Sequence, residues 1–132
     1  MEENKHKILL VEDEENLREI LKYQLENAGY QVYTAADGME ALNLARKHKI
    51  DLIILDLMLP KLDGFTVCRL LKFSEQYKKI PLIMITARTN PEDRERGVGM
   101  GADFYLTKPL NKEELLEKIA ELLKPKEIPH ET

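Results

Sequence analysis

The chain has 132 residues, enough for one domain of ordinary size with its own hydrophobic core. Apolar residues make up 43% and charged residues 33%, which excludes a disordered chain, and the net charge of −4 gives no support for direct binding to nucleic acid or to a membrane. No apolar run approaches the roughly 20 residues of a membrane span. Cys68 is the lone cysteine, so we expect a small buried residue in a reducing cytoplasm, with a reactive thiol as the alternative.

The first expected element is a strand over residues 8–11, a continuously apolar run typical of a strand buried on both faces of a parallel sheet. A helix follows, with an apolar face at helical spacing and an end marked by Gly29. That face is formed by Leu17, Ile20, Leu21, Leu25 and Ala28. The next strand, over residues 32–35, carries Tyr33 and Thr34 and is less apolar, so we place it at an edge of the sheet.

The middle of the chain continues with a helix, a strand and another helix. Asp37 is placed to cap the second helix, with Glu40 at the spacing of a capping box. A second continuously apolar strand is expected over residues 52–55. Asp63 is placed to cap the third helix, whose expected buried residues are Phe65, Val67, Cys68, Leu70 and Leu71.

The last third of the chain is predicted to hold a strand at 82–85, a helix, a strand at 104–106 and a final helix. Asn90 before a proline suits the start of the first of these helices, and Asn111 suits the start of the second. Strand and helix thus alternate five times, which favours a parallel sheet with helices on both faces. Residues 125–132 contain two prolines and little to bury, so we expect a disordered tail or the start of a linker.

Two glycines, Gly97 and Gly99, fall within the helix expected after Asn90. Each is about 1 kcal/mol less favourable in a helix than alanine. They either shorten this helix or leave it marginal and easily repositioned. Both interpretations stay open.

Polar side chains follow four of the predicted strands at their carboxyl ends, where ligands bind in doubly wound sheets. They are Glu12, Asp13, Asp56, Thr86 and Lys108. Two unit charges ~4 Å apart repel by about 4 kcal/mol at an effective dielectric near 20, so converging carboxylates need a cation unless one is protonated. Water-accessible carboxylates suit Mg²⁺. Lys108 could then bind a phosphoryl oxygen, while one carboxylate acts as the nucleophile that forms an aspartyl phosphate.

Each of these residues also has an ordinary structural interpretation. Glu12 and Asp13 could begin a helix, and Asp56 could be a turn residue. Thr86 could be a strand-end hydroxyl, and Lys108 a surface lysine. The structural interpretation requires a separate ordinary role for every one of these residues, at the ends of four strands at once. We therefore favour the functional interpretation.

Four segments of the chain occur in a specific order: ILLVEDEENLR, LIILDLMLPKLDGF, IPLIMITA and GADFYLTKPL. Together they resemble the receiver domains of two-component response regulators over residues 8–124, with residues 1–7 and 125–132 as tails. The resemblance implies an α/β, flavodoxin-like fold. Its doubly wound, five-stranded parallel sheet would have the order 2-1-3-4-5 and carry five helices.

The resemblance also implies a phosphorylation switch, not an enzyme beyond its own phosphorylation and dephosphorylation. Asp56 is the implied phospho-acceptor, and the implied donor is a phosphohistidine on a sensor histidine kinase or a histidine phosphotransfer protein. The cofactor is Mg²⁺, held by Glu12, Asp13, Asp56 and the backbone carbonyl of Met58.

Further roles follow from the same resemblance. Thr86, Ala87 and Lys108 surround the phosphoryl group, Tyr105 changes orientation with Thr86, and the peptide bond before Pro109 is cis. Phosphorylation is then expected to alter the surface of the fourth helix, fifth strand and fifth helix, which binds an unknown output partner.

Three positions leave details open. Met58 and Arg88 occupy variable positions thought to tune autodephosphorylation, so the lifetime of the phosphoryl group is not predicted. Phe104 stands where transcription-factor-type relatives commonly carry an aspartate used in dimer contacts. A phosphorylation-dependent dimer is therefore open but weakened.

Two alternatives belong to other classes of protein. A Mg²⁺-dependent aspartyl-phosphate phosphatase would usually carry a second acidic residue two positions after the nucleophile, where this chain has Met58. A flavodoxin-like FMN electron carrier would need a phosphate-binding loop of Ser, Thr and Gly after the first strand, where this chain has EDEEN. These residues disfavour both alternatives.

Overall fold

The structure, a computed structural model, describes residues 5–60, 63–87 and 91–124. Within these ranges five strands alternate with five helices, and none of the helices is long and apolar enough to cross a membrane. The strands are β1 (Lys7–Val11), β2 (Gln31–Ala35), β3 (Leu52–Asp56), β4 (Leu82–Thr86) and β5 (Phe104–Thr107). The helices are α1 (Glu15–Asn27), α2 (Gly38–Lys47), α3 (Gly64–Lys72), α4 (Pro91–Gly99) and α5 (Lys112–Leu123).

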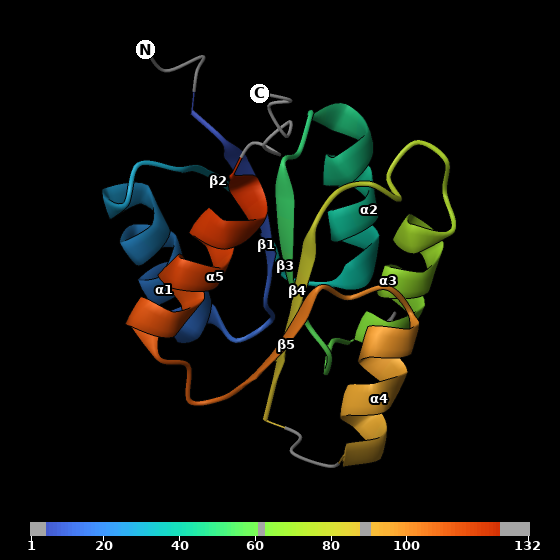
Figure 1. Ribbon diagram of the computed structural model, residues 1–132. Helices are drawn as coiled ribbons and strands as arrows, with labels where there is room; N and C mark the ends of the chain where they lie inside the picture. Colours follow the sequence, from blue (N-terminus) through green and yellow to red (C-terminus); the bar gives the residue numbers. More distant parts are fainter. Residues whose placement is uncertain (1–4, 61–62, 88–90, 125–132) are drawn as a thin grey trace, which may run out of the picture.

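The strands form one parallel sheet in the order β2-β1-β3-β4-β5, which confirms the predicted fold (Figure 1). β2 lies at an edge, as its polar residues predicted. Each strand extends one residue beyond the apolar run that predicted it; β1 begins at Lys7 and β3 ends at Asp56. The reason is that strand pairing depends on the backbone, so it continues past the last buried apolar side chain.

Each face of the sheet has its own core, because side chains alternate along the strands. Helices α1 and α5 cover one face, and α2, α3 and α4 cover the other (Figure 1). The α1/α5 core includes Ile8, Leu10, Leu21, Leu25, Ile54, Ile83, Leu115 and Ile119. The opposite core includes Leu9, Val11, Ala41, Leu55, Phe65, Cys68, Leu71, Met84 and Tyr105.

Three predicted capping residues begin their helices as expected. Asp37, Asp63 and Asn111 each accept a hydrogen bond from the backbone N–H three residues later, at 2.9, 3.0 and 2.8 Å. Asn90 lies outside the described residues.

Because the strands are parallel, the helices between them run back and begin at the carboxyl end of the sheet. First turns of α1, α2 and α5 carry acidic residues, and last turns of α2, α3 and α4 carry basic ones.

Some predictions for the helices were wrong. Ile20 and Leu70 were expected to be buried, but they are 53% and 47% exposed. Ala28 is also exposed and forms the C-cap of α1, before Gly29 at φ 101°. Helical spacing made the predicted apolar faces of α1 and α3 too wide, because the sheet covers a narrower stripe of each helix than the apolar pattern. Helix α4 runs through Gly97 and ends at Gly99, and Gly101 follows at φ 102°.

Cys68 is fully buried, as predicted, and its Sγ lies 3.7 Å from the carbonyl oxygen of Met100. Burial raises the pKa of this thiol to about 11. The nearby charge of Lys72 lowers the pKa, but by less than burial raises it. A thiol that stays protonated at neutral pH is a poor nucleophile, so Cys68 is a packing residue.

Candidate functional site

An ion-pair cluster lies at the carboxyl end of the sheet, built from the ends of three strands. Glu12 follows β1, Asp56 is the last residue of β3, and Lys108 follows β5. The Lys108 Nζ atom lies 2.9 Å from Glu12 Oε1 and 2.9 Å from Asp56 Oδ2. A single ammonium group therefore bridges carboxylates from two other strands.

Both bridged carboxylates are buried and held by the backbone. Glu12 is 0% exposed and Asp56 is 3% exposed. The backbone N–H of Glu14 donates to Glu12 Oε2, and that of Met58 donates to Asp56 Oδ1, each at 3.0 Å. These bonds fix the orientation of the carboxylates from the loops that follow β1 and β3. Glu12 Oε1 has no hydrogen bond within the described part of the chain, although it is paired with Lys108 by charge.

Asp13 supplies a third carboxylate beside this pair, and its side chain is exposed. One oxygen each from Glu12, Asp13 and Asp56 lies within 4.8 Å of the others. Two buried carboxylates with one exposed carboxylate give a hard oxygen donor set with access to water, which suits Mg²⁺. Glu12 Oε1 adds a buried oxygen whose hydrogen-bonding capacity is unused. The residues present therefore fit this ion.

Burial and ion pairing shift two pKa values in the cluster. Burial raises the pKa of Glu12, and the hydrogen bond from the Glu14 backbone and the ion pair with Lys108 only partly oppose that effect. Burial alone would lower the pKa of Lys108, but the hydrogen bond to Asp56 and the negative charges of Asp56 and Glu12 outweigh it, so the pKa of Lys108 is raised. Lys108 thus remains an ammonium group at neutral pH.

Where the structure describes them, the other residues predicted for the site lie on or just after β3, β4 and β5. Thr86 is fully buried at the end of β4, and its carbonyl oxygen accepts a 2.8 Å hydrogen bond from the backbone N–H of Lys108. Ala87 follows it and is exposed. Tyr105 is buried in the core on the α3 side and pairs in register with Met84. The Lys108–Pro109 peptide bond is cis. Met58 is 51% exposed, and Arg88 lies outside the described residues.

Gly64, which the sequence did not single out, packs directly against the backbone of Asp56. A Cβ atom on Gly64 would lie 2.5 Å from the carbonyl oxygen of Asp56 and 2.6 Å from Leu57 Cα. The N–H of Gly64 also donates to the carbonyl oxygen of Leu57 at 2.9 Å. The signal that could have found it is a glycine directly after a capping aspartate, where helix propensity disfavours glycine.

Arg18 on α1 was also missed. Its Nη1 atom donates to the backbone carbonyl oxygens of Glu12 and Asp13, at 2.9 and 3.3 Å. The side chain therefore ties α1 to the loop that carries two of the three carboxylates. Nothing in the sequence distinguishes Arg18 from the other charged residues of a helix surface.

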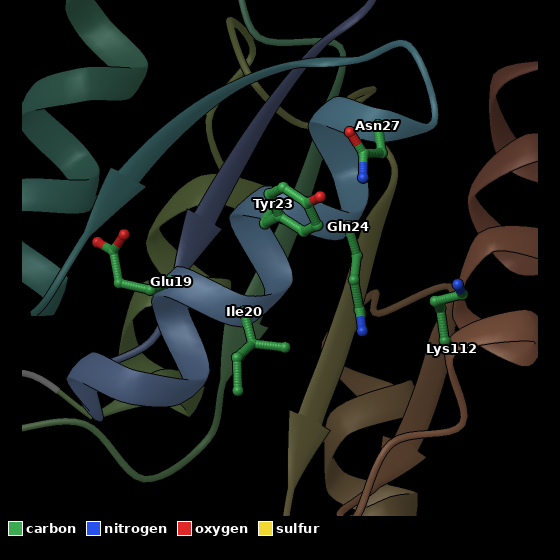
Figure 2. Close-up of a pocket in the computed structure, with 6 residues that line it drawn as sticks. All are labelled: Glu19, Ile20, Tyr23, Gln24, Asn27 and Lys112. Atoms are coloured by element: carbon green, nitrogen blue, oxygen red, sulfur yellow. The ribbon is translucent and has the colours of Figure 1, made fainter.

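A groove beside the cluster runs over α1 toward the start of α5. Its outer part has a volume of about 400 Å³ and is lined by Glu19, Ile20, Tyr23, Gln24, Asn27 and Lys112. Figure 2 shows five of these residues on α1, with Lys112 approaching from α5. An inner part of about 310 Å³ shares Ile20 and reaches Lys108 and Pro109. The exposed Ile20 lines both parts, and the lining of the inner part includes Lys108.

The family model described as "Response regulator receiver domain" matches residues 8–120. The chain belongs to this family. The receiver domain is 46% identical over 122 residues to the alkaline phosphatase synthesis transcriptional regulatory protein PhoP of Bacillus subtilis, covering 92% of this chain and 50% of the relative. It is 44% identical over 118 residues to the DNA-binding dual master transcriptional regulator RpaA of Synechocystis, covering 89% and 49%. It thus spans about half the length of these curated relatives.

Solved structures agree with the receiver fold. The chemotaxis protein CheY4 of Vibrio cholerae matches with a TM-score of 0.85 and 39% identity, over 90% of this chain and 99% of that one. The receiver domain of a sensor histidine kinase from Pseudomonas aeruginosa matches with a TM-score of 0.83 and 33% identity, over 90% and 98%. The latter structure has a magnesium ion coordinated in its active site cleft. The predicted family and fold are confirmed.

Proposed function

We propose that this receiver domain accepts a phosphoryl group on Asp56 from a phosphohistidine of a sensor histidine kinase or phosphotransfer protein, with Mg²⁺ bound at the site. One observation carries the proposal: Asp56 is buried, and its Oδ2 atom lies 2.9 Å from the ammonium group of Lys108. Asp56 Oδ1 accepts a hydrogen bond from the Met58 N–H and Oδ2 accepts one from Lys108, so both oxygens of the proposed acceptor are held in place.

The residues divide the chemistry between them. Glu12, Asp13, Asp56 and the Met58 carbonyl would hold Mg²⁺, whose charge neutralises phosphoryl oxygens when it is bound. Asp56 forms the bond to phosphorus as the bond from phosphorus to the donor's histidine nitrogen breaks. Lys108 pairs with the Asp56 carboxylate before the transfer and with a phosphoryl oxygen after it. The positive charge of Lys108 is therefore compensated in both states.

The proposed signal is a change in the α4, β5 and α5 surface. Thr86 at the end of β4 and Tyr105 on β5 lie on neighbouring strands, which offers a route from Asp56 to that surface. Two curated relatives are named as transcriptional regulators, one of them as DNA-binding. We propose by analogy that the output partner is a DNA-binding region or protein. The expectation of no nucleic-acid contact would then hold only for the receiver domain itself.

Intact mass spectrometry after incubation with acetyl phosphate and Mg²⁺ tests the acceptor. The wild type should gain one phosphoryl group, and Asp56→Asn should gain none because its amide is not a nucleophile. Asp63→Asn is the matched control, since Asp63 is an exposed aspartate that caps α3, and it should be phosphorylated. EDTA should abolish the adduct on the wild type and on Asp63→Asn. An equal adduct on Asp56→Asn would refute the proposed acceptor.

A further inference from the structure

Arg96 joins α4 to α3 through an aromatic ring. Its guanidinium carbon Cζ lies 4.1 Å from the centroid of the Phe65 ring, a distance typical of a cation–π contact. Arg96 itself is exposed, whereas Phe65 is only 3% exposed. The contact therefore attaches a surface helix to a residue of the core.

Phe65 lies close in the chain to the proposed acceptor. It follows Gly64, which packs without space for a Cβ atom against the backbone of Asp56 and Leu57. Phe65 also shares a core cluster with Leu57 and Tyr105. A shift of the loop after β3 would therefore be passed to Phe65 before it reached other parts of α3.

Those side chains of helix α4 that the structure describes are exposed. Pro91, Glu92 and Glu95 are exposed, and two of its nine residues are glycines. A second link follows its end, where Cys68 Sγ of α3 lies 3.7 Å from the carbonyl oxygen of Met100. Both links attach α4 to α3, and Arg96 supplies the one nearer to Asp56 along α3.

We propose that Arg96 is a positioning residue, whose contact with Phe65 makes α4 follow the first turn of α3. The coupling of this contact to signalling rests on the proposed phosphorylation of Asp56. The contact between Arg96 and Phe65 does not depend on that proposal. When Asp56 becomes phosphorylated and the loop after it adjusts, Phe65 carries Arg96, and with it α4, to a new position. Arg96→Lys would keep the positive charge but lose the flat guanidinium group that stacks on the Phe65 ring.

Hydrogen exchange of the α4 amides, read by mass spectrometry, tests this role. The proteins are the wild type, Arg96→Met and Arg96→Lys, each with Mg²⁺ alone and with Mg²⁺ and beryllium fluoride as a phosphoryl mimic. Arg96→Met should speed exchange in α4 by about two- to fivefold without the mimic, and Arg96→Lys should restore part of the protection. The mimic should change α4 exchange less in Arg96→Met than in the wild type.

Lys118→Met provides the matched control, because Lys118 Nζ lies 4.6 Å from the Phe104 ring centroid and forms a comparable contact between α5 and β5. It should leave α4 exchange at the wild-type rate. Unchanged α4 exchange in Arg96→Met, or an equal change in Lys118→Met, would overturn the positioning role. If beryllium fluoride changes α4 exchange in Arg96→Met as much as in the wild type, the proposed coupling is wrong.

The adduct with acetyl phosphate separates this inference from the proposed function. Arg96→Met should be phosphorylated as the wild type is, because Arg96 does not touch Asp56. If the wild type forms no adduct, the proposed function fails, while the exchange comparison without the mimic still decides the contact. A missing adduct in Arg96→Met alone would place Arg96 in the acceptor site and overturn its assignment as a positioning residue.

Discussion

Glu12 is fully buried, and burial raises its pKa even though Lys108 lies 2.9 Å away. A carboxyl group with a higher pKa in the folded state binds more protons there than in the unfolded chain. The free energy of unfolding therefore falls as pH rises from the ordinary value of 4.5 through the raised pKa of Glu12. The raised pKa of Lys108 adds stability that is present below 10.5 and is lost as pH rises through its folded value.

Replacing Glu12 by glutamine should remove the first of these pH dependences. We expect urea unfolding between pH 5 and 8, with EDTA present, to show wild-type stability falling with pH relative to Glu12→Gln. The lost partner of Lys108 adds an offset that is constant over this range, because Lys108 stays charged. Glu113→Gln, at an exposed position in the first turn of α5, should run parallel to the wild type. Parallel curves for Glu12→Gln would contradict the raised pKa.

Strand ends predict which residues meet at the site, but not how they meet. Glu12, Asp56 and Lys108 could be placed at one rim because the carboxyl ends of parallel strands share an edge. The bridge made by Lys108 depends on the path of the loop after β5, which no local pattern encodes. Gly64 and Arg18 were missed for the same reason, since their contacts with the site are set by packing.

At the scale of the elements, two glycines offer opposite tests of local packing. Gly64→Ala should destabilise the domain by about 1–3 kcal/mol, because its Cβ atom would overlap the backbone at Asp56. Gly99→Ala meets nothing within 4 Å and should stabilise α4, by up to about 1 kcal/mol. Urea unfolding measures both changes. Equal effects of the two alanines would mean that Gly64 does not pack as described.

The start of a helix was easier to predict than its buried face. Asp37, Asp63 and Asn111 act within four residues of the chain, so their role could be predicted from sequence alone. The exposure of Ile20 and Leu70 depends on how each helix lies on the sheet. Ile20 also lines the part of the groove whose lining includes Lys108.

At the scale of the whole molecule, we propose that the groove over α1 is the surface on which a donor protein docks. A large protein must contact more than the buried acceptor, and the groove is continuous with Lys108 and Pro109. Ile20→Asp should slow phosphotransfer from a phosphohistidine protein by about tenfold, and leave phosphorylation by acetyl phosphate unchanged.

Met39→Asp is the control for this prediction. Met39 is 51% exposed on α2, which covers the opposite face of the sheet. It should affect neither reaction. Slower phosphorylation of Ile20→Asp by acetyl phosphate as well would point to a damaged site and not to a lost docking contact.

The parallel arrangement of the strands has one more consequence, because it sorts the charged helix ends. Acidic first turns lie at the end that holds Asp56, while Arg46, Lys47 and Lys72 belong to last turns at the other end. The side chains of these helix turns therefore add negative charge at the acceptor end and positive charge at the other end, within a domain of net charge −4. A divalent cation is attracted to the acceptor end, and an approaching charged protein experiences a torque that turns the domain before contact. This rotational steering weakens as salt shortens the Debye length, which is about 8 Å at physiological ionic strength.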